Sequence, residues 1–191
     1  MSGEWLVIRG SGIVAFALLS AAVIWGLLAS TKLLQSVVKA KPLTWFHESL
    51  GIGALVATLV HIFVLSTHDF FEFSWAEILI PGSSDWKRLP IALGVVAFYG
   101  LVVVSMSFYF KKRIGQRAWR SIHYGSFGVF VASLVHGIQA GSDSAHPMVI
   151  GIYLGAVVVI MMLLAHRLMS ASAASTAPRE RGPKTIERIT R

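Results

Sequence analysis

Five long apolar segments dominate the sequence, and each is about as long as a membrane crossing requires. A helix needs roughly 20 predominantly apolar residues to cross the hydrocarbon core of a bilayer. Within the five segments only Glu48 and Arg120 carry a formal charge, and both lie near a segment end. The chain is therefore predicted to be an all-α integral membrane protein, a five-helix transmembrane bundle. The predicted spans are 11–30, 47–66, 90–109, 119–140 and 147–165.

The five spans use most of the 191 residues, which predicts one folded domain. We expect the bundle to occupy residues 1–168, followed by a tail at 169–191. Small, polar and basic residues make up most of this tail, a composition that favours disorder and contact with anionic lipid. Between the second and third spans, Ser74 and Glu77 have the spacing of a capping box, and the Pro-Gly pair at 81–82 is a stop signal. A short interfacial helix is predicted there, with an irregular aromatic anchor as the alternative.

The net charge of +8 arises from basic residues in three short segments, 31–46, 110–120 and the tail from Arg167. The positive-inside rule places such segments in the cytoplasm. The more acidic connections 67–89 and 141–146 then face outward. We therefore expect a multi-pass protein of the cell membrane, with its N-terminus outside and its C-terminus in the cytoplasm. Basic residues divided among three short segments do not form one soluble face, so no nucleic-acid partner is expected.

Four of the seven histidines lie on two of the predicted spans. His47 and His61 are 14 residues apart on the second span, a rise of about 21 Å, and their side chains lie within roughly 40° of one helix face. His123 and His136 lie on the fourth span, which crosses the membrane in the same direction. The sequence therefore predicts two levels, each holding one histidine from each helix.

Ionisable side chains in a membrane interior are costly and usually functional. Two neutral imidazoles at one level can fill both axial positions of a haem iron, an arrangement suited to electron transfer. Packing histidines are one alternative. A metal-ion pathway is another, but it favours carboxylate or cysteine partners beside the imidazoles. The chain has no cysteine, which excludes thiolate-bound clusters and covalent c-type haem attachment.

The spacing of the second histidine pair departs from ideal helix geometry. Thirteen residues place the side chains of His123 and His136 roughly 140° apart. We expect either a local irregularity around Gly125 and Gly128, or two rings that reach their irons from different sides.

Two histidine pairs with these spacings, the sequence WRSIH at 119–123, and the glycines and GSD sequence that follow His136 resemble the ferric reductase-like transmembrane domain. This family includes NADPH oxidases, ferric reductases and the haem-binding subunit of the bacterial methionine sulfoxide reductase system. The resemblance covers about residues 47–165. The family commonly has six spans, whereas this sequence predicts five.

The resemblance implies a bis-haem four-helix core that binds two haem b groups. It places His47 and His123 on the inner iron, and His61 and His136 on the outer iron. It also implies electron transfer from a cytoplasmic flavoprotein or flavin reductase to an extracytoplasmic acceptor, which is a protein, ferric iron, quinone or oxygen. The sequence has no Gly-rich phosphate loop after a strand, so neither FAD nor NADPH is expected on this chain.

Rival functions remain at this point. The same fold could serve as a single-haem or quinone-linked cytochrome b subunit, or as a non-redox membrane subunit or transporter. No residue has the features of a nucleophile or general base, so the chain is expected to act as the electron-transfer component of an oxidoreductase.

Several polar residues are weaker candidates for cofactor contacts. Arg117 and Arg120 on the inner side, and Lys87 and Arg88 on the outer side, suit the carboxylates of haem propionates. Interfacial snorkelling is the alternative for all four. His68 is a candidate contact for the outer haem or the acceptor, with an ordinary surface histidine as the alternative.

Overall fold

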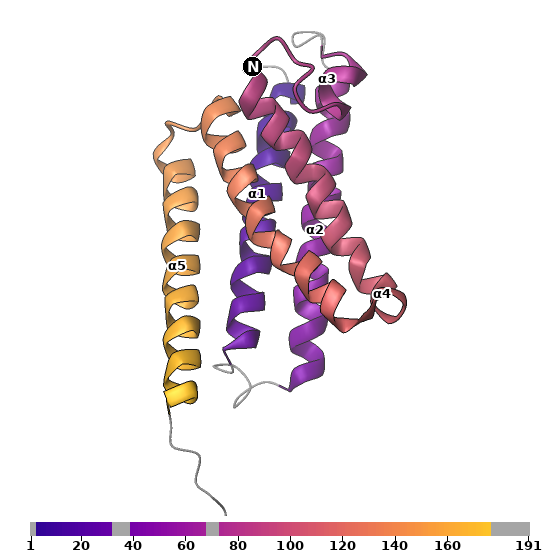
Figure 1. The fold of residues 1–191 in the computed structure, drawn as a ribbon. Coiled ribbons are helices and arrows are strands. Elements are labelled where there is room, and N and C mark those ends of the chain that lie inside the picture. The colour runs from indigo at the N-terminus through magenta and orange to yellow at the C-terminus, as the bar shows by residue number, and fades with distance from the viewer. Residues whose placement is uncertain (1–2, 32–38, 68–72, 177–191) are drawn as a thin grey trace, which may run out of the picture.

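The computed structural model describes residues 3–31, 39–67 and 73–176 of the chain. Within these residues it contains no strand and five α-helices (Figure 1), namely α1 (Gly3–Ser30), α2 (Ala40–Ser66), α3 (Trp75–Leu79), α4 (Arg88–Ala140) and α5 (Pro147–Thr176). Each of α1, α2, α4 and α5 is long and apolar enough to cross a membrane. The predicted helical membrane bundle is thereby confirmed.

One long element, α4, contains both the third and the fourth predicted spans. Inside it Gly115 has non-helical backbone angles, φ 81° and ψ 160°, a conformation open essentially only to glycine. The helix turns back on itself there (Figure 1), which divides α4 into a first arm, 88–114, and a second arm, 116–140. At 1.5 Å per residue each arm is roughly 37–41 Å long, which exceeds the roughly 30 Å of a hydrocarbon core.

The bundle has two ends, which we name by the structures found there. The α3 end holds α3 and the beginnings of α1 and α4, and the Gly115 end holds the turn between the two arms of α4 (Figure 1). Since α1 and α2 are antiparallel neighbours, the α3 end also receives the C-terminal end of α2.

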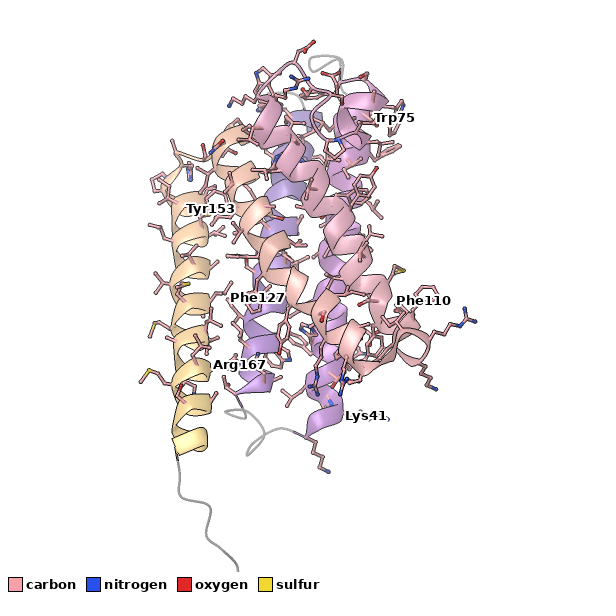
Figure 2. All side chains as sticks on the ribbon, in the orientation of Figure 1. Lys41, Trp75, Phe110, Phe127, Tyr153 and Arg167 are labelled. Carbon is pink, nitrogen blue, oxygen red and sulfur yellow. The ribbon has the colours of Figure 1, made fainter. Side chains whose placement is uncertain are left out.

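The core is centred on α1, which packs against α2, α4 and α5. Phe16 of α1 stacks on Phe130 of α4, with ring centroids 5.7 Å apart, and meets the edge of Tyr153 of α5 at 4.9 Å. Figure 2 shows Tyr153 directed from α5 toward the bundle. The same buried cluster continues along the helices through Leu19, Val23, Leu27, Ala54, Ala97, Leu101, Val129, Val149, Ala156 and Ile160.

Large apolar side chains also cover much of the outer surface. On α5 these include Leu154, Val158, Met161 and Met162, all more than half exposed. An exposed apolar surface of this extent is a liability in water but the expected surface toward lipid. The structure thus supports the membrane setting by its surface as well as by helix length.

The short helix predicted after residue 73 is present. Ser74 caps α3, its side chain accepts from the Glu77 amide, and the Glu77 carboxylate accepts from the Ser74 amide, which completes the capping box. The helix ends before Gly82, whose φ of 86° is positive. The predicted boundary at residue 168 differs from the structure, because α5 continues to Thr176. The rest of the predicted tail lies outside the described residues.

Candidate functional site

At the Gly115 end, one histidine from α2 faces one from the second arm of α4. The ring centroids of His47 and His123 lie 5.8 Å apart, with their planes at 69°. The two helices are distant in sequence, so this proximity depends on the packing of the bundle. The structure thereby brings together the two histidines that were expected at one level.

At the α3 end, His61 of α2 and His136 of the second arm line one cavity of about 440 Å³. Apolar side chains including Phe16 and Tyr153 form much of its wall. A volume of this size is within the range of small-molecule and cofactor sites. The second expected histidine pair therefore lines one shared space of the size that cofactor sites have.

Three of the four rings donate a hydrogen bond to a backbone carbonyl on another helix or on the other arm of α4. Nδ1 lies 3.0 Å from the Ala22 carbonyl oxygen in His47, 2.9 Å from that of Ile8 in His61, and 2.8 Å from that of Pro90 in His136. A carbonyl oxygen only accepts, so Nδ1 carries the proton in each case. In a neutral ring this leaves Nε2 with its lone pair, the tautomer of a metal-ligating histidine whose other nitrogen is held by a backbone carbonyl.

His123 is oriented differently from the other three rings. It stacks on Trp119, one helical turn earlier, with ring centroids 5.1 Å apart and planes at 22°. The Lys111 ammonium lies 4.1 Å from the centre of the Trp119 ring system, a cation–π contact. The indole Nε1 of Trp119 is buried and has no hydrogen-bond partner among the described residues. A buried donor without a partner is rare in proteins and points to a missing acceptor.

The histidine pairs can supply two ligands each to a metal, and no more. Among the described residues no group of three or more His, Asp or Glu side chains is placed to hold an ion. A metal at either level would therefore take its remaining ligands from outside the side chains. When two imidazole nitrogens bind one metal at about 2 Å each, the centroids of the two rings lie roughly 6 Å apart. The observed 5.8 Å between His47 and His123 is close to this value.

The helix irregularity expected at Gly125 and Gly128 is absent. Between residues 116 and 140 the backbone angles are helical, and the break in α4 lies instead at Gly115. The alternative expectation, in which the two rings approach from different sides of the helix, describes the structure better, since His123 and His136 have different neighbours. His123 faces α2, whereas His136 bonds to the first arm of α4.

The weaker candidates divide into two groups. Lys87 lines the cavity at the α3 end and donates to the Gln139 carbonyl oxygen at 2.8 Å. Arg88 donates instead to the Gly82 carbonyl oxygen at 2.7 Å, in the loop after α3. Arg117 and Arg120 are exposed on the second arm near the Gly115 end. His68 lies outside the described residues.

Three glycines that the sequence analysis passed over lie against the histidine rings. A Cβ placed on Gly12 would lie 3.2 Å from the nearest atom of His61, one on Gly26 would lie 3.1 Å from His47, and one on Gly94 would lie 2.6 Å from His136. A signal for two of them was in the sequence. The separation of Gly12 and Gly26 along the chain equals that of His47 and His61.

An ion pair at the α3 end was also missed. The Arg9 guanidinium of α1 binds both carboxylate oxygens of Asp143, in the connection between α4 and α5. Both residues line the cavity that His61 and His136 share. The pair therefore closes one side of that cavity with two charges that compensate each other.

Comparison with known proteins identifies the fold family. The family model for the ferric reductase like transmembrane component matches residues 11–134, about two thirds of the chain. The match begins earlier than the region 47–165 expected from the motifs, and it ends two residues before His136. No curated protein and no solved structure matches the chain significantly. Because the family model covers well over half of the sequence and the structure is an apolar helical bundle, the chain belongs to the ferric reductase like transmembrane family.

Proposed function

We propose that this protein is a membrane b-type cytochrome that transfers single electrons across the bilayer. In this proposal His47 and His123 hold one haem at the Gly115 end, and His61 and His136 hold a second at the α3 end. Bound haem would supply a one-electron iron couple. The protein's part is to place the two groups and to set their surroundings.

The observation that carries the proposal is the orientation of the imidazoles. Three rings have Nδ1 held by a carbonyl, which leaves Nε2 to bind a metal. In a neutral ring held in this way Nε2 keeps a lone pair for a metal, which a role in packing alone does not require. The contact of His47 with His123 and the shared cavity of His61 and His136 support a second histidine ligand at each level.

The residues around the histidine pairs also include hydrogen-bond donors that suit the propionate groups of a haem. The buried Nε1 of Trp119 is a donor in need of an acceptor beside His123. At the other level the Lys87 ammonium lines the cavity of His61 and His136. Propionate oxygens accept hydrogen bonds from such donors. Each level therefore offers a donor near its histidine pair.

The direction of transfer follows from the charge distribution. The Gly115 end carries Lys111, Lys112, Arg113, Arg117 and Arg120, and the positive-inside rule assigns such an end to the cytoplasm. We infer that a cytoplasmic flavoprotein or flavin reductase donates electrons there. The acceptor then lies outside the cell membrane, near the α3 end, and is a protein, ferric iron, quinone or oxygen.

Purified protein tests the cofactor part of the proposal. A reduced-minus-oxidised absorption spectrum is expected to show the sharp bands of low-spin b-type haem, with two haems per polypeptide. One haem per polypeptide would favour the single-haem alternative, and a folded protein with no Soret band would favour the non-redox membrane subunit or transporter.

Liposomes test the transport part. With ferricyanide trapped inside and dihydroflavin mononucleotide supplied outside, ferricyanide is expected to be reduced only when the protein is present. The matched control is the His61→Ala variant, which is expected to lose the haem at the α3 end and to interrupt transfer. His166→Ala, a change of an exposed histidine on α5, is expected to leave the rate unchanged. Equal rates with and without the protein would contradict transmembrane transfer.

A further inference from the structure

One local arrangement occurs three times in the bundle. Each time a histidine Nδ1 meets the carbonyl of a residue on another helix or arm, and the ring lies against a glycine four residues later. The three sets are His61 with Ile8 and Gly12, His47 with Ala22 and Gly26, and His136 with Pro90 and Gly94.

Helix geometry explains why the glycine occupies that position. The carbonyl of residue i points toward the C-terminus and bonds to the amide of residue i+4. The Cβ of residue i+4 tilts back toward the N-terminus, over that carbonyl. A side chain at i+4 therefore crowds the second lone pair of the oxygen, and glycine leaves it open.

We propose that Gly12, Gly26 and Gly94 are positioning residues that set the tautomer and the direction of the three histidines. Each opens the carbonyl four residues earlier to the Nδ1 proton, and the opposite edge of the ring, Nε2, then points into the bundle. The effect of the glycines on haem binding rests on the proposed haem ligation, whereas their effect on the histidine tautomers does not depend on it.

The register of the helices supports a shared role. Because α1 and α2 are antiparallel and the two spacings are equal, both glycines of α1 meet a histidine of α2, Gly12 at His61 and Gly26 at His47. The two arms of α4 are also antiparallel. There Gly94 faces His136, and Gly100, farther along the first arm, faces Val129, farther back along the second.

The same register accounts for the fourth histidine. The separation of Gly94 and Ser107 along the chain equals that of His123 and His136. In antiparallel arms with Gly94 opposite His136, Ser107 is therefore the residue expected opposite His123. Serine carries a Cβ, so the carbonyl four residues before it is not opened in the same way. His123 has no backbone carbonyl partner among the described residues and is stacked on Trp119 instead.

Close helix packing is the competing explanation for the glycines, since small residues let membrane helices approach. Gly100 separates the two explanations. A Cβ placed there would lie 2.6 Å from Cγ2 of Val129, as close as one on Gly94 to His136. Gly100→Ala therefore introduces the same degree of crowding on the same arm, without touching a histidine.

The first experiment reads the tautomers in the unmodified protein. Side-chain nitrogen NMR of ¹⁵N-histidine-labelled, haem-free protein at about pH 8, where imidazole is neutral, distinguishes Nδ1–H from Nε2–H rings. Signals are assigned by single replacement of each histidine. His47, His61 and His136 are expected as Nδ1–H tautomers. Nε2–H tautomers at these residues would overturn the proposal, even if the protein binds haem.

The second experiment replaces each glycine by alanine and measures the haem held by the histidine that the glycine contacts. Gly12→Ala and Gly94→Ala are expected to weaken haem binding at the α3 end about 10- to 100-fold, the usual cost of losing a partner of a metal-ligating histidine. Gly26→Ala is expected to weaken only the haem at the Gly115 end. The midpoint potential of the affected haem rises, because an imidazole without its Nδ1 acceptor is a weaker donor.

The controls complete the test. Gly100→Ala is expected to lower thermal stability but to leave both haem potentials unchanged. Gly10→Ala, on the same helix as Gly12 and in open space, is expected to change neither. If Gly100→Ala alters the haems as much as Gly94→Ala, packing explains the glycines and the proposal is wrong. If no preparation holds haem, the proposed function fails, while the tautomer measurement still decides the role of the glycines.

Discussion

The indole of Trp119 lies nearly parallel to the imidazole of His123, with ring centroids 5.1 Å apart. The two residues are one turn apart on the second arm of α4, where side chains at i and i+4 meet. Lys111 from the first arm covers the other side of the stack at 4.1 Å. This stack fixes the direction of the one histidine of the four that has no backbone carbonyl bond among the described residues.

Replacement of Trp119 by phenylalanine or alanine separates stacking from hydrogen bonding. Trp119→Phe keeps an aromatic face on His123, so the low-spin electron paramagnetic resonance signal of the haem at the Gly115 end is expected to stay close to that of the unmodified protein. Trp119→Ala removes the stack and is expected to shift that signal and to lower stability by about 2 kcal/mol, since the side chain is only partly buried. Identical signals in both variants would remove Trp119 from the account.

The ion pair of Arg9 with Asp143 is expected to stabilise the α3 end. The side chains are 26% and 21% exposed, so the coupling energy is set near the upper limit for exposed pairs, about 1 kcal/mol. A double-mutant cycle of Arg9→Gln and Asp143→Asn, followed by thermal unfolding, measures this coupling. Asp85→Asn, an exposed change at the same end, is the control. Additive effects of the two replacements would show that the pair contributes nothing.

Gly115 is expected to tolerate no side chain without strain. Its backbone angles lie in a region essentially restricted to glycine, so Gly115→Ala should destabilise the protein by about 1–3 kcal/mol. Gly125→Ala, at a helical position in open space on the second arm, should instead be neutral or stabilising by up to about 1 kcal/mol. Thermal unfolding of the two variants checks the opposite signs. A neutral Gly115→Ala would mean that the turn between the arms adopts another conformation.

Helix α3 is expected to weaken in acid. Hydrogen bonds from the backbone amide and hydroxyl of Ser74 lower the pKa of the Glu77 carboxyl below its usual value. A lowered folded-state pKa contributes stability above the unfolded pKa, and this contribution is lost as pH falls through the folded value. Amide exchange in α3, corrected for its intrinsic pH dependence, should therefore show falling protection as pH drops from about 6 to 3. In Glu77→Gln the protection should not change with pH, and a slope equal to that of the unmodified protein would contradict this assignment.

Much of the architecture could be predicted because membrane spans follow from length and hydropathy alone. The five apolar segments correspond to α1, α2, the two arms of α4 and α5. The Ser74 capping box was equally accessible, since it depends on residues three positions apart. Local and compositional signals of this kind need no knowledge of which helices touch.

The details around the histidines could not be predicted, because they depend on which helices are neighbours. The bonds to the Ile8, Ala22 and Pro90 carbonyls, and the pairing of Arg9 with Asp143, join segments far apart in sequence. The expected irregularity in the second arm was wrong because it assumed that both of its histidines approach α2 from the same side of the helix. His136 bonds through Nδ1 to the first arm and also lines the cavity that it shares with His61, so a regular helix accommodates the spacing of the two histidines.

Haem content per polypeptide in single and double histidine variants tests the central claim most directly. With two haem b groups in the unmodified protein, His61→Ala is expected to retain one, and the double variant at His47 and His61 is expected to retain none. His166→Ala should retain two. Haem content that is the same in all four proteins would contradict ligation by the two histidine pairs.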